Sequence, residues 1–151
     1  MDAQRPGALT SADTEARVRA AGLRSTRQRL TVLGALDAIG GHRTADELVG
    51  DLADRGTALP RSTVFNVLDD LVSAGLVLRA DLGSGAARYE SAAAAGPHHH
   101  FVCQVCGSIE DVGLDRLGAI SLKPDPRFEV ESLQVVLRGR CRACQAGGRP
   151  R

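Results

Sequence analysis

Aromatic side chains are scarce in this 151-residue chain, at 3% of the residues, and tryptophan is absent. A large ligand pocket lined with aromatic rings is therefore not expected. No apolar run approaches the length of a membrane-spanning helix. The N-terminal segment MDAQRPGALTSADTEAR also lacks the apolar core of a signal peptide. These absences predict a cytoplasmic protein with no membrane partner and no small-molecule substrate.

Lysine is almost absent as well, because Lys123 is the only one in the chain. Arginine therefore supplies nearly all the positive charge, and the formal net charge is only +1. Bulk charge gives no sign of nucleic-acid binding, so any basic surface must be local. Arginine suits bidentate contacts to phosphate and guanine better than lysine does. The hydrophobic content of 43% indicates a globular chain.

Four cysteines form two Cys-x-x-Cys pairs, Cys103 with Cys106 and Cys141 with Cys144. In a reducing cytoplasm, such pairs favour a metal site over disulfides. Two pairs give four thiolates around one point, which is the ligand set of structural Zn(II). A redox-active disulfide pair and an iron–sulfur cluster are the alternatives. A closed four-thiolate site has no open position, so it predicts an architectural role rather than catalysis.

The first half of the chain has the pattern of four helices followed by a hairpin. Gly40, Gly56 and Gly75 stand where helices should end. This order predicts a winged helix-turn-helix, with a recognition helix beginning at Arg61, although a small helical domain packed against another element would give the same pattern. The expected helices span 11–21, 26–40, 44–56 and 61–75, and the expected strands span 76–82 and 86–91.

The second half of the chain has a different pattern. It predicts a short strand in SIEDVG, a brief helix over 114–120 and a long alternating strand over 128–139. A unit this small needs a metal, a dimer partner or both to be stable. The predicted organisation is a disordered leader at 1–10, a winged-helix domain at 11–90, a hinge at 91–97, a small domain at 98–145 that depends on a metal or a dimer partner, and a tail at 146–151.

Three consecutive histidines precede the first cysteine pair. On a strand, His98 and His100 face the same side and His99 faces the other. Two imidazoles on one face can begin a second metal site, but a polar run in a hinge gives the same sequence. His42, Glu90 and Asp111 are further candidate ligands. Each of them also suits an ordinary surface role, and sequence spacing alone does not bring the five together.

The motifs GLRSTRQRLTVL, HRTADEL, STVFNVLDDLVSAGLV, ARYE, HHHFVCQVCG and CRAC resemble the ferric uptake regulator (Fur) family of metal-dependent bacterial repressors. The resemblance covers roughly residues 20–145. It implies an α+β fold with an N-terminal winged helix-turn-helix domain and a small C-terminal α/β dimerisation domain containing structural zinc. It also implies a homodimer on a palindromic DNA operator, and no enzymatic activity.

The resemblance also implies two metal sites. The cysteines match the structural zinc ligands Cys103, Cys106, Cys141 and Cys144. Three histidines and two carboxylates match the regulatory ligands of the family, namely His42, Glu90, His98, His100 and Asp111. A nitrogen and oxygen set suits Fe(II) or Mn(II), although imidazole also takes zinc. A further metal site of some members needs a histidine where Leu133 stands, and we expect that site to be absent.

Asp111 and Asn66 resemble the peroxide-sensing members of the family, and ARYES with HHHFVC resembles the actinobacterial FurA type. In such members, iron and peroxide oxidise a ligand histidine, here at the position of His42 or His98. Glu90 departs from this pattern, because peroxide sensors often carry Asp there. The prediction is a repressor that responds to peroxide. The alternative is a plain iron-uptake regulator or, less in keeping with the ligands, a zinc-uptake regulator.

The hypothesis for mechanism is that one ion clamps the two domains and so fixes the spacing of the recognition helices in the dimer. Phe65 departs from the family pattern, in which tyrosine is usual. The candidate DNA contacts are Arg61, Ser62, Thr63, Phe65 and Asn66 in the recognition helix, with Arg17, Arg19, Arg24 and Arg27 for phosphates. The competing classes are an enzyme with an open metal site and a thiol redox switch.

Overall fold

The computed structural model describes residues 10–83, 85–93, 98–113, 126–129, 133 and 135–147. The chain divides into two compact units, Met1–Gly96 and Pro97–Arg151. Among the described residues, no helix combines the length and the apolar character that crossing a membrane requires.

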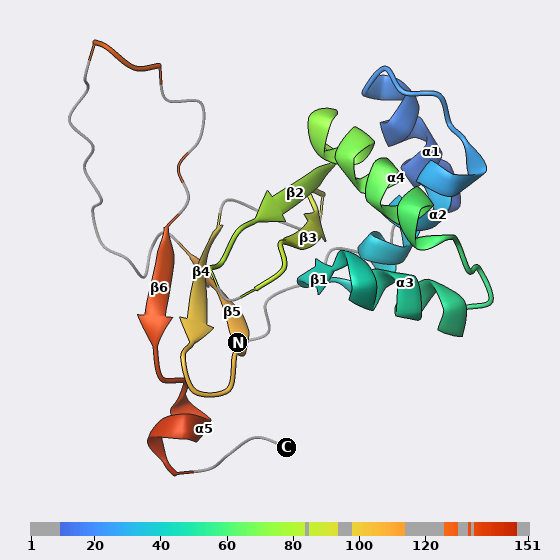
Figure 1. Cartoon of the computed structure of the whole chain (residues 1–151). Helices are drawn as coiled ribbons and strands as arrows, with labels where there is room; N and C mark the ends of the chain where they lie inside the picture. Colours follow the sequence, from blue (N-terminus) through green and yellow to red (C-terminus); the bar gives the residue numbers. More distant parts are fainter. Residues whose placement is uncertain are drawn as a thin grey trace. The chain divides into compact units, whose positions relative to one another are not determined.

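Four helices make up most of the first unit (Figure 1). Short local signals set their ends. Thr26 caps the second helix by accepting a hydrogen bond from the Arg29 N–H, and Gly40 ends it with a φ of 67°. Gly75, with a φ of 71°, follows the fourth helix. The helices are α1 (Ser11–Ala20), α2 (Arg27–Ile39), α3 (Ala45–Asp54) and α4 (Arg61–Ser73).

A small antiparallel sheet completes the first unit. Its strands are β1 (Arg43–Thr44), β2 (Val77–Ala80) and β3 (Arg88–Ser91), in the order β1-β3-β2. Because β3 is central, it pairs with both neighbours: Tyr89 lies opposite Arg43 and Arg79. The hairpin of β2 and β3 is the wing, so this unit has the winged helix-turn-helix architecture that the sequence predicts.

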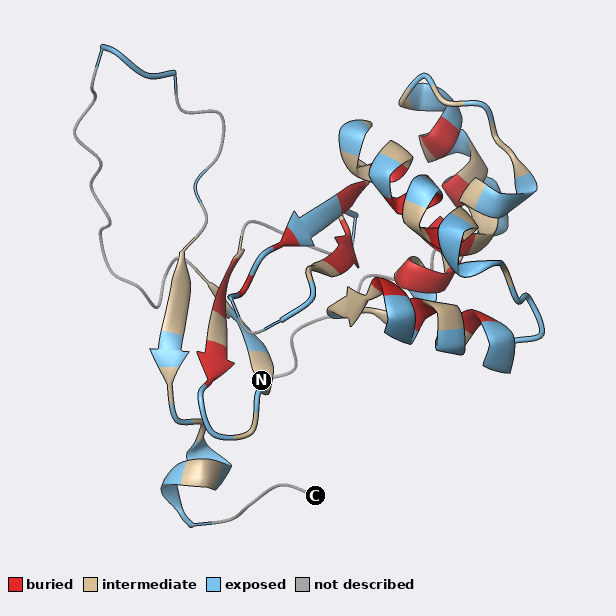
Figure 2. Cartoon of the chain, viewed as in Figure 1, coloured by how far each residue is buried: buried red, intermediate tan, exposed pale blue. Residues whose placement is uncertain are grey.

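The core of the first unit lies among the helices, where Figure 2 shows the buried positions. In the sequence of α2 the large apolar residues Leu30, Leu33, Leu36 and Ile39 form a stripe at helical spacing. Leu33 and Leu36 are buried, whereas Leu30 and Ile39 are only partly buried. Val32 and Ala35 are buried as well, so the inward face of α2 is rotated from that stripe.

The second unit contains a mixed sheet of three strands. These are β4 (His98–Cys103), β5 (Ile109–Gly113) and β6 (Val136–Gly139), in the order β5-β4-β6. The central strand β4 runs antiparallel to β5 and parallel to β6. A single helical turn, α5 (Arg142–Gln145), follows. The order of helices, wing and separate mixed sheet confirms the predicted α+β class.

Several predicted boundaries need correction. Thr10, which the predicted leader includes, belongs to the capping box of α1. Ser91 is the last residue of β3, where the predicted strand over 86–91 also ends. Phe128 and Glu129 lie outside any strand, so the long alternating strand is wrong at its start. The predicted helix at 114–120 lies outside the described residues. The sequence analysis did not predict β1 or α5.

A capping box links β1 to α3 and supplies a test of the fold. The Thr44 hydroxyl accepts from the Glu47 N–H at 3.1 Å, and the Glu47 carboxylate accepts from the Thr44 N–H at 2.8 Å. We expect Thr44→Ala to lower the free energy of unfolding by about 1 kcal/mol, because an N-cap hydrogen bond is lost. Urea denaturation measures this change. Thr31→Ala, inside α2, should be neutral or slightly stabilising, because alanine has the higher helix propensity. Equal losses in both variants would contradict the capping role.

Candidate metal centres and nucleic-acid interface

The four cysteines gather at one point of the second unit. Their Sγ atoms all lie within 4.8 Å of one another, and none is in a disulfide. A tetrahedral Zn(II) site with bonds of about 2.3 Å has sulfur–sulfur edges of roughly 3.8 Å. The Sγ atoms of Cys106 and Cys141 are 3.8 Å apart. The donor set and its spacing therefore fit structural zinc.

The local backbone favours thiolate at one corner of this cluster. The Cys141 N–H lies 3.4 Å from Cys103 Sγ. This hydrogen bond, followed by one from the Cys106 backbone, lowers the pKa of Cys103 to about 6. Burial and the neighbouring thiols raise the pKa of Cys144 to about 12. Four thiols so close together become thiolates together only with a cation among them, and a zinc ion supplies that charge.

One pair of predicted regulatory ligands lies in the first unit. His42 directly precedes β1, and Glu90 stands in β3. His42 Nε2 and Glu90 Oε2 are 3.6 Å apart. This separation is long for a hydrogen bond, but it suits two ligands that are each about 2.1 Å from a shared ion. β1 and β3 pair through Arg43 and Tyr89, so the sheet places both side chains.

The other predicted regulatory ligands lie together in the second unit. His98 and His100 are on β4, with ring centroids 4.9 Å apart and planes at 83°. Asp111 is opposite His100 in the register with β5, and its Oδ1 is 3.8 Å from His98 Nε2. The strand alternation that the sequence analysis assumed is therefore present. It places two imidazoles and one carboxylate on a common face.

His99 has a different environment from its two neighbours. It is buried, and its Nδ1 accepts a hydrogen bond from the Val135 N–H at 3.2 Å. An accepting Nδ1 carries no proton, so the neutral ring has its proton on Nε2. His99 thus joins β4 to the segment that leads into β6. This contact gives it a structural role that sequence alone did not indicate.

The recognition helix α4 presents a prearranged arginine. Arg61 Nε and Nη2 bind the Asp46 carboxylate from the side, at 2.5 and 3.2 Å. The same guanidinium lies over the Phe65 ring, 4.5 Å from its centroid. The hydrogen bond from Arg61 lowers the pKa of Asp46. This side-on pairing leaves the Nη1 protons and one Nη2 proton available to bind a base or a phosphate. Ser62 and Asn66 are exposed beside it, and Thr63 is half-buried.

The four arginines predicted to contact phosphates have unequal environments. Arg17 Nη1 donates to Asp37 at 2.8 Å, so its guanidinium is engaged inside the first unit. Arg19 pairs with Glu15 on the surface of α1. Arg24 and Arg27 are exposed. An open hollow at the start of α2 is lined by Arg19, Leu23, Arg24, Ser25 and Thr26.

Comparison with known proteins identifies the family. The family model described as "Ferric uptake regulator family" matches residues 20–137. The chain belongs to the ferric uptake regulator family. It is 32% identical over 134 residues to the transcriptional regulator FurA of Mycobacterium tuberculosis, covering 87% of this chain and 90% of that protein. It is 34% identical over 131 residues to a zinc uptake regulation protein of the same organism, covering 84% and 98%.

A solved structure supports the same assignment. The ferric uptake regulator of Pseudomonas aeruginosa, determined with manganese, superposes with a TM-score of 0.70 at 27% identity. The match covers 85% of this chain and 98% of that one. As a Fur-family member, the chain is a metal-dependent transcriptional regulator that binds DNA operators as a homodimer. It is not an enzyme. The identification from sequence motifs is confirmed.

Two acidic residues at these sites were missed by the sequence analysis. Asp46 holds Arg61, and Asp37 holds Arg17. Asp46 lies within the first turn of α3, where the helix dipole favours acidic residues. Its position therefore gave no sign of a second role. Asp37 lies near the end of α2, where the dipole disfavours an acid. That unfavourable position was the one available signal of a special role.

The cysteine cluster makes a direct prediction about zinc. Cys103→Ser should lose the bound zinc and unfold the second unit, because the other described buried apolar residue of that unit is Val102. The helices of the first unit should persist, since their core contains no cysteine. Metal analysis by mass spectrometry and far-UV circular dichroism test both statements. Ser108→Ala is the control, because Ser108 contacts Cys106 without offering a thiolate. A zinc-loaded Cys103→Ser protein would contradict the assignment.

Proposed function

We propose that this regulator is a repressor controlled by Fe(II) or Mn(II). The observation that supports it is the chemistry of two ligand clusters, one in each unit, which contain only nitrogen and oxygen donors. The proposed regulatory ligands are His42, Glu90, His98, His100 and Asp111. All four cysteines belong to the zinc cluster, so none is left for this second site.

The donor types narrow the choice of ion. Imidazole and carboxylate ligands without thiolate suit Fe(II) and Mn(II), although imidazole binds zinc as well. Zinc-sensing members of the family usually place a cysteine in the regulatory site. The two mycobacterial relatives carry iron-type and zinc-type names at similar identity. The preference for Fe(II) or Mn(II) therefore rests on the nitrogen and oxygen donors, and zinc regulation is the less favoured alternative.

The division of ligands between two units suggests how the ion acts. One ion held by His42 and Glu90 together with His98, His100 and Asp111 would clamp the two units. In a dimer, the clamp would fix the spacing of the recognition helices on a palindromic operator. The ion favours this form only by its greater affinity for it. DNA must then tighten metal binding by the same factor. We also propose a cytoplasmic location, because the protein must reach DNA to act.

We assign DNA contacts to two surfaces of the first unit. On α4, Arg61 is the proposed reader of a guanine edge or a phosphate, in a position set by Asp46 and Phe65. Ser62, Thr63 and Asn66 extend the same surface, and the Phe65 ring can contact a thymine methyl. Phosphate contacts fall to Arg19, Arg24 and Arg27 around the start of α2, where helix N–H groups add to the attraction. Arg17 is left out because Asp37 and Ser91 engage its guanidinium.

We further propose that peroxide is a signal. Fe(II) held by the proposed regulatory ligands would promote the oxidation of His42 or His98 by peroxide, in which one peroxide oxygen enters the imidazole ring and the other leaves as water. The sequence similarity of Asp111 and Asn66 to peroxide-sensing members supports this step, while Glu90 departs from their pattern. Regulation of iron uptake without peroxide sensing is the alternative.

The proposed clamp predicts which substitutions weaken binding of the regulatory ion without changing the zinc content. His42→Ala should lose metal-dependent operator binding. Its Mn(II) affinity should fall by more than the roughly 10–100-fold that loss of an outer-shell partner costs. Zinc content and helical circular dichroism should stay unchanged. Asp111→Ala should weaken Mn(II) binding, whereas Glu110→Ala, its exposed neighbour on β5, should not. Operator titrations with and without Mn(II) measure the effect. Loss of zinc in His42→Ala would refute the two-site assignment.

The peroxide step has a mass signature. Anaerobic protein loaded with Fe(II) should gain one oxygen atom on the His42 or His98 peptide after stoichiometric peroxide. The Mn(II)-loaded protein should gain none. Peptide mass spectrometry reads the modification, and operator binding measured in parallel should fall only in the iron form. Unmodified histidines with intact DNA binding would leave the ion itself as the signal and favour the iron-uptake alternative.

A further inference from the structure

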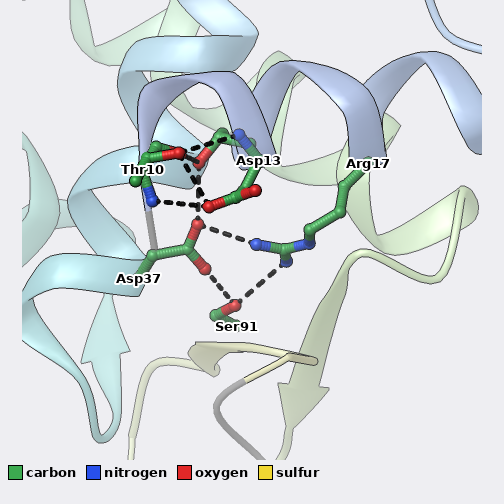
Figure 3. Close-up of polar contacts among 6 residues, drawn as sticks. Thr10, Asp13, Arg17, Asp37 and Ser91 are labelled. Carbon is green, nitrogen blue, oxygen red and sulfur yellow. Dashed lines mark hydrogen bonds and ion pairs between the residues drawn. The ribbon is translucent and has the colours of Figure 1, made fainter. Parts of the chain in front are cut away.

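A buried polar cluster joins two helices of the first unit to the end of β3. Asp37, on α2, is at its centre, between Arg17 and Ser91 (Figure 3). Arg17 Nη1 donates to Asp37 Oδ2 at 2.8 Å, and the Thr14 hydroxyl lies 3.2 Å from the same oxygen. The Ser91 hydroxyl donates to Asp37 Oδ1. The Asp37 side chain is 3% exposed, and Ser91 is 2% exposed.

The three central groups form a closed ring of hydrogen bonds. Arg17 Nη2 donates to Ser91 Oγ at 3.3 Å, Ser91 donates to Asp37, and Asp37 accepts from Arg17. Both carboxylate oxygens and the hydroxyl are therefore used within one small volume. A buried carboxylate is costly unless it is fully paired, and a fully paired network fixes its members in one geometry. The ring thus specifies where the end of β3 lies relative to α1 and α2.

The two segments that this ring joins are those that precede and follow the regulatory ligands of the first unit. Ser91 follows Glu90 directly, and adjacent strand residues point to opposite faces. Asp37 lies in the last turn of α2, from which Gly40 and Gly41 lead to His42. The ring is therefore a second tie between these segments, separate from the pairing of β1 with β3. Two ties on different sides hold His42 and Glu90 at their separation of 3.6 Å.

We propose that Asp37, with Arg17 and Ser91, is a positioning group for the regulatory metal: it sets the distance between His42 and Glu90 without touching the ion. This inference rests on the proposed function, because it requires those two residues to be ligands. It also gives α1 a part in metal sensing, since Arg17 and Thr14 come from that helix. Asp37, Arg17 and Ser91 together form the Asp37 brace.

The test uses full-length, zinc-loaded protein and Mn(II) as the probe. Ser91→Ala removes one side of the ring and keeps the Asp37–Arg17 ion pair, so it is the milder variant. Asp37→Asn removes the charge. Both should weaken Mn(II) binding about 10-fold or more, as loss of an outer-shell partner does. The signal of free Mn(II) in electron paramagnetic resonance gives the affinity, and zinc content should not change.

A matched control separates positioning from general stability. Asp70→Asn breaks another ion pair of the first unit, that between α2 and α4, where Arg29 Nη2 lies 2.7 Å from Asp70. It should lower the unfolding midpoint and leave the Mn(II) affinity unchanged. If Ser91→Ala and Asp37→Asn lower the midpoint but bind Mn(II) as tightly as the parent, the brace is only structural and the inference is wrong.

One more variant distinguishes failure of the inference from failure of the proposed function. Glu90→Gln removes a proposed ligand and should weaken Mn(II) binding more than Ser91→Ala does. If Glu90→Gln binds Mn(II) normally, the ligand assignment fails, and the brace fails with it. If Glu90→Gln loses Mn(II) while Ser91→Ala and Asp37→Asn keep it, the regulatory site stands and only the brace is overturned.

Discussion

The second unit depends on the four cysteine sulfurs at the end of β4. Among its described residues, Val102 and Cys103 are the buried apolar ones, so burial of apolar surface alone gives little stability. The cluster ties the turn after β4 to the segment after β6. β4 also carries His98 and His100. The geometry of the proposed sensor ligands in this unit therefore depends on a strand that the zinc site holds in place.

The first unit is stabilised without a metal. Its helices bury a contiguous set of leucine and valine side chains, and short polar motifs fix the elements around that core. The Asp37 brace and the Thr44 capping box are two such motifs, and both Asp37 and Thr44 lie close in sequence to His42. On the proposed assignment, two ligands would come from a well-packed unit and three from a zinc-held sheet, so each group of ligands would be preorganised within its own unit.

Much of this arrangement was accessible from sequence because its signals are local. The Thr44 box, the glycine after α2 and the alternation of His98 and His100 each depend on residues within a few positions of one another. The family resemblance supplied the long-range grouping that spacing could not. β1 was missed because a two-residue strand has no periodicity, and the start of β6 was misplaced because alternation continues outside it. The pairing of Arg17 with Ser91 could not be predicted, because the two residues are 74 positions apart in the chain.

The placement of ligands for two ions on one strand has a further consequence. On the proposed assignment, β4 presents sensor ligands at its first residues and a zinc ligand at its last. A chain without zinc would lack the sheet that orients those histidines, so it would not report on iron or manganese at all. Zinc would then have to bind before the second ion. Operator binding would require both an adequate zinc supply and Fe(II) or Mn(II).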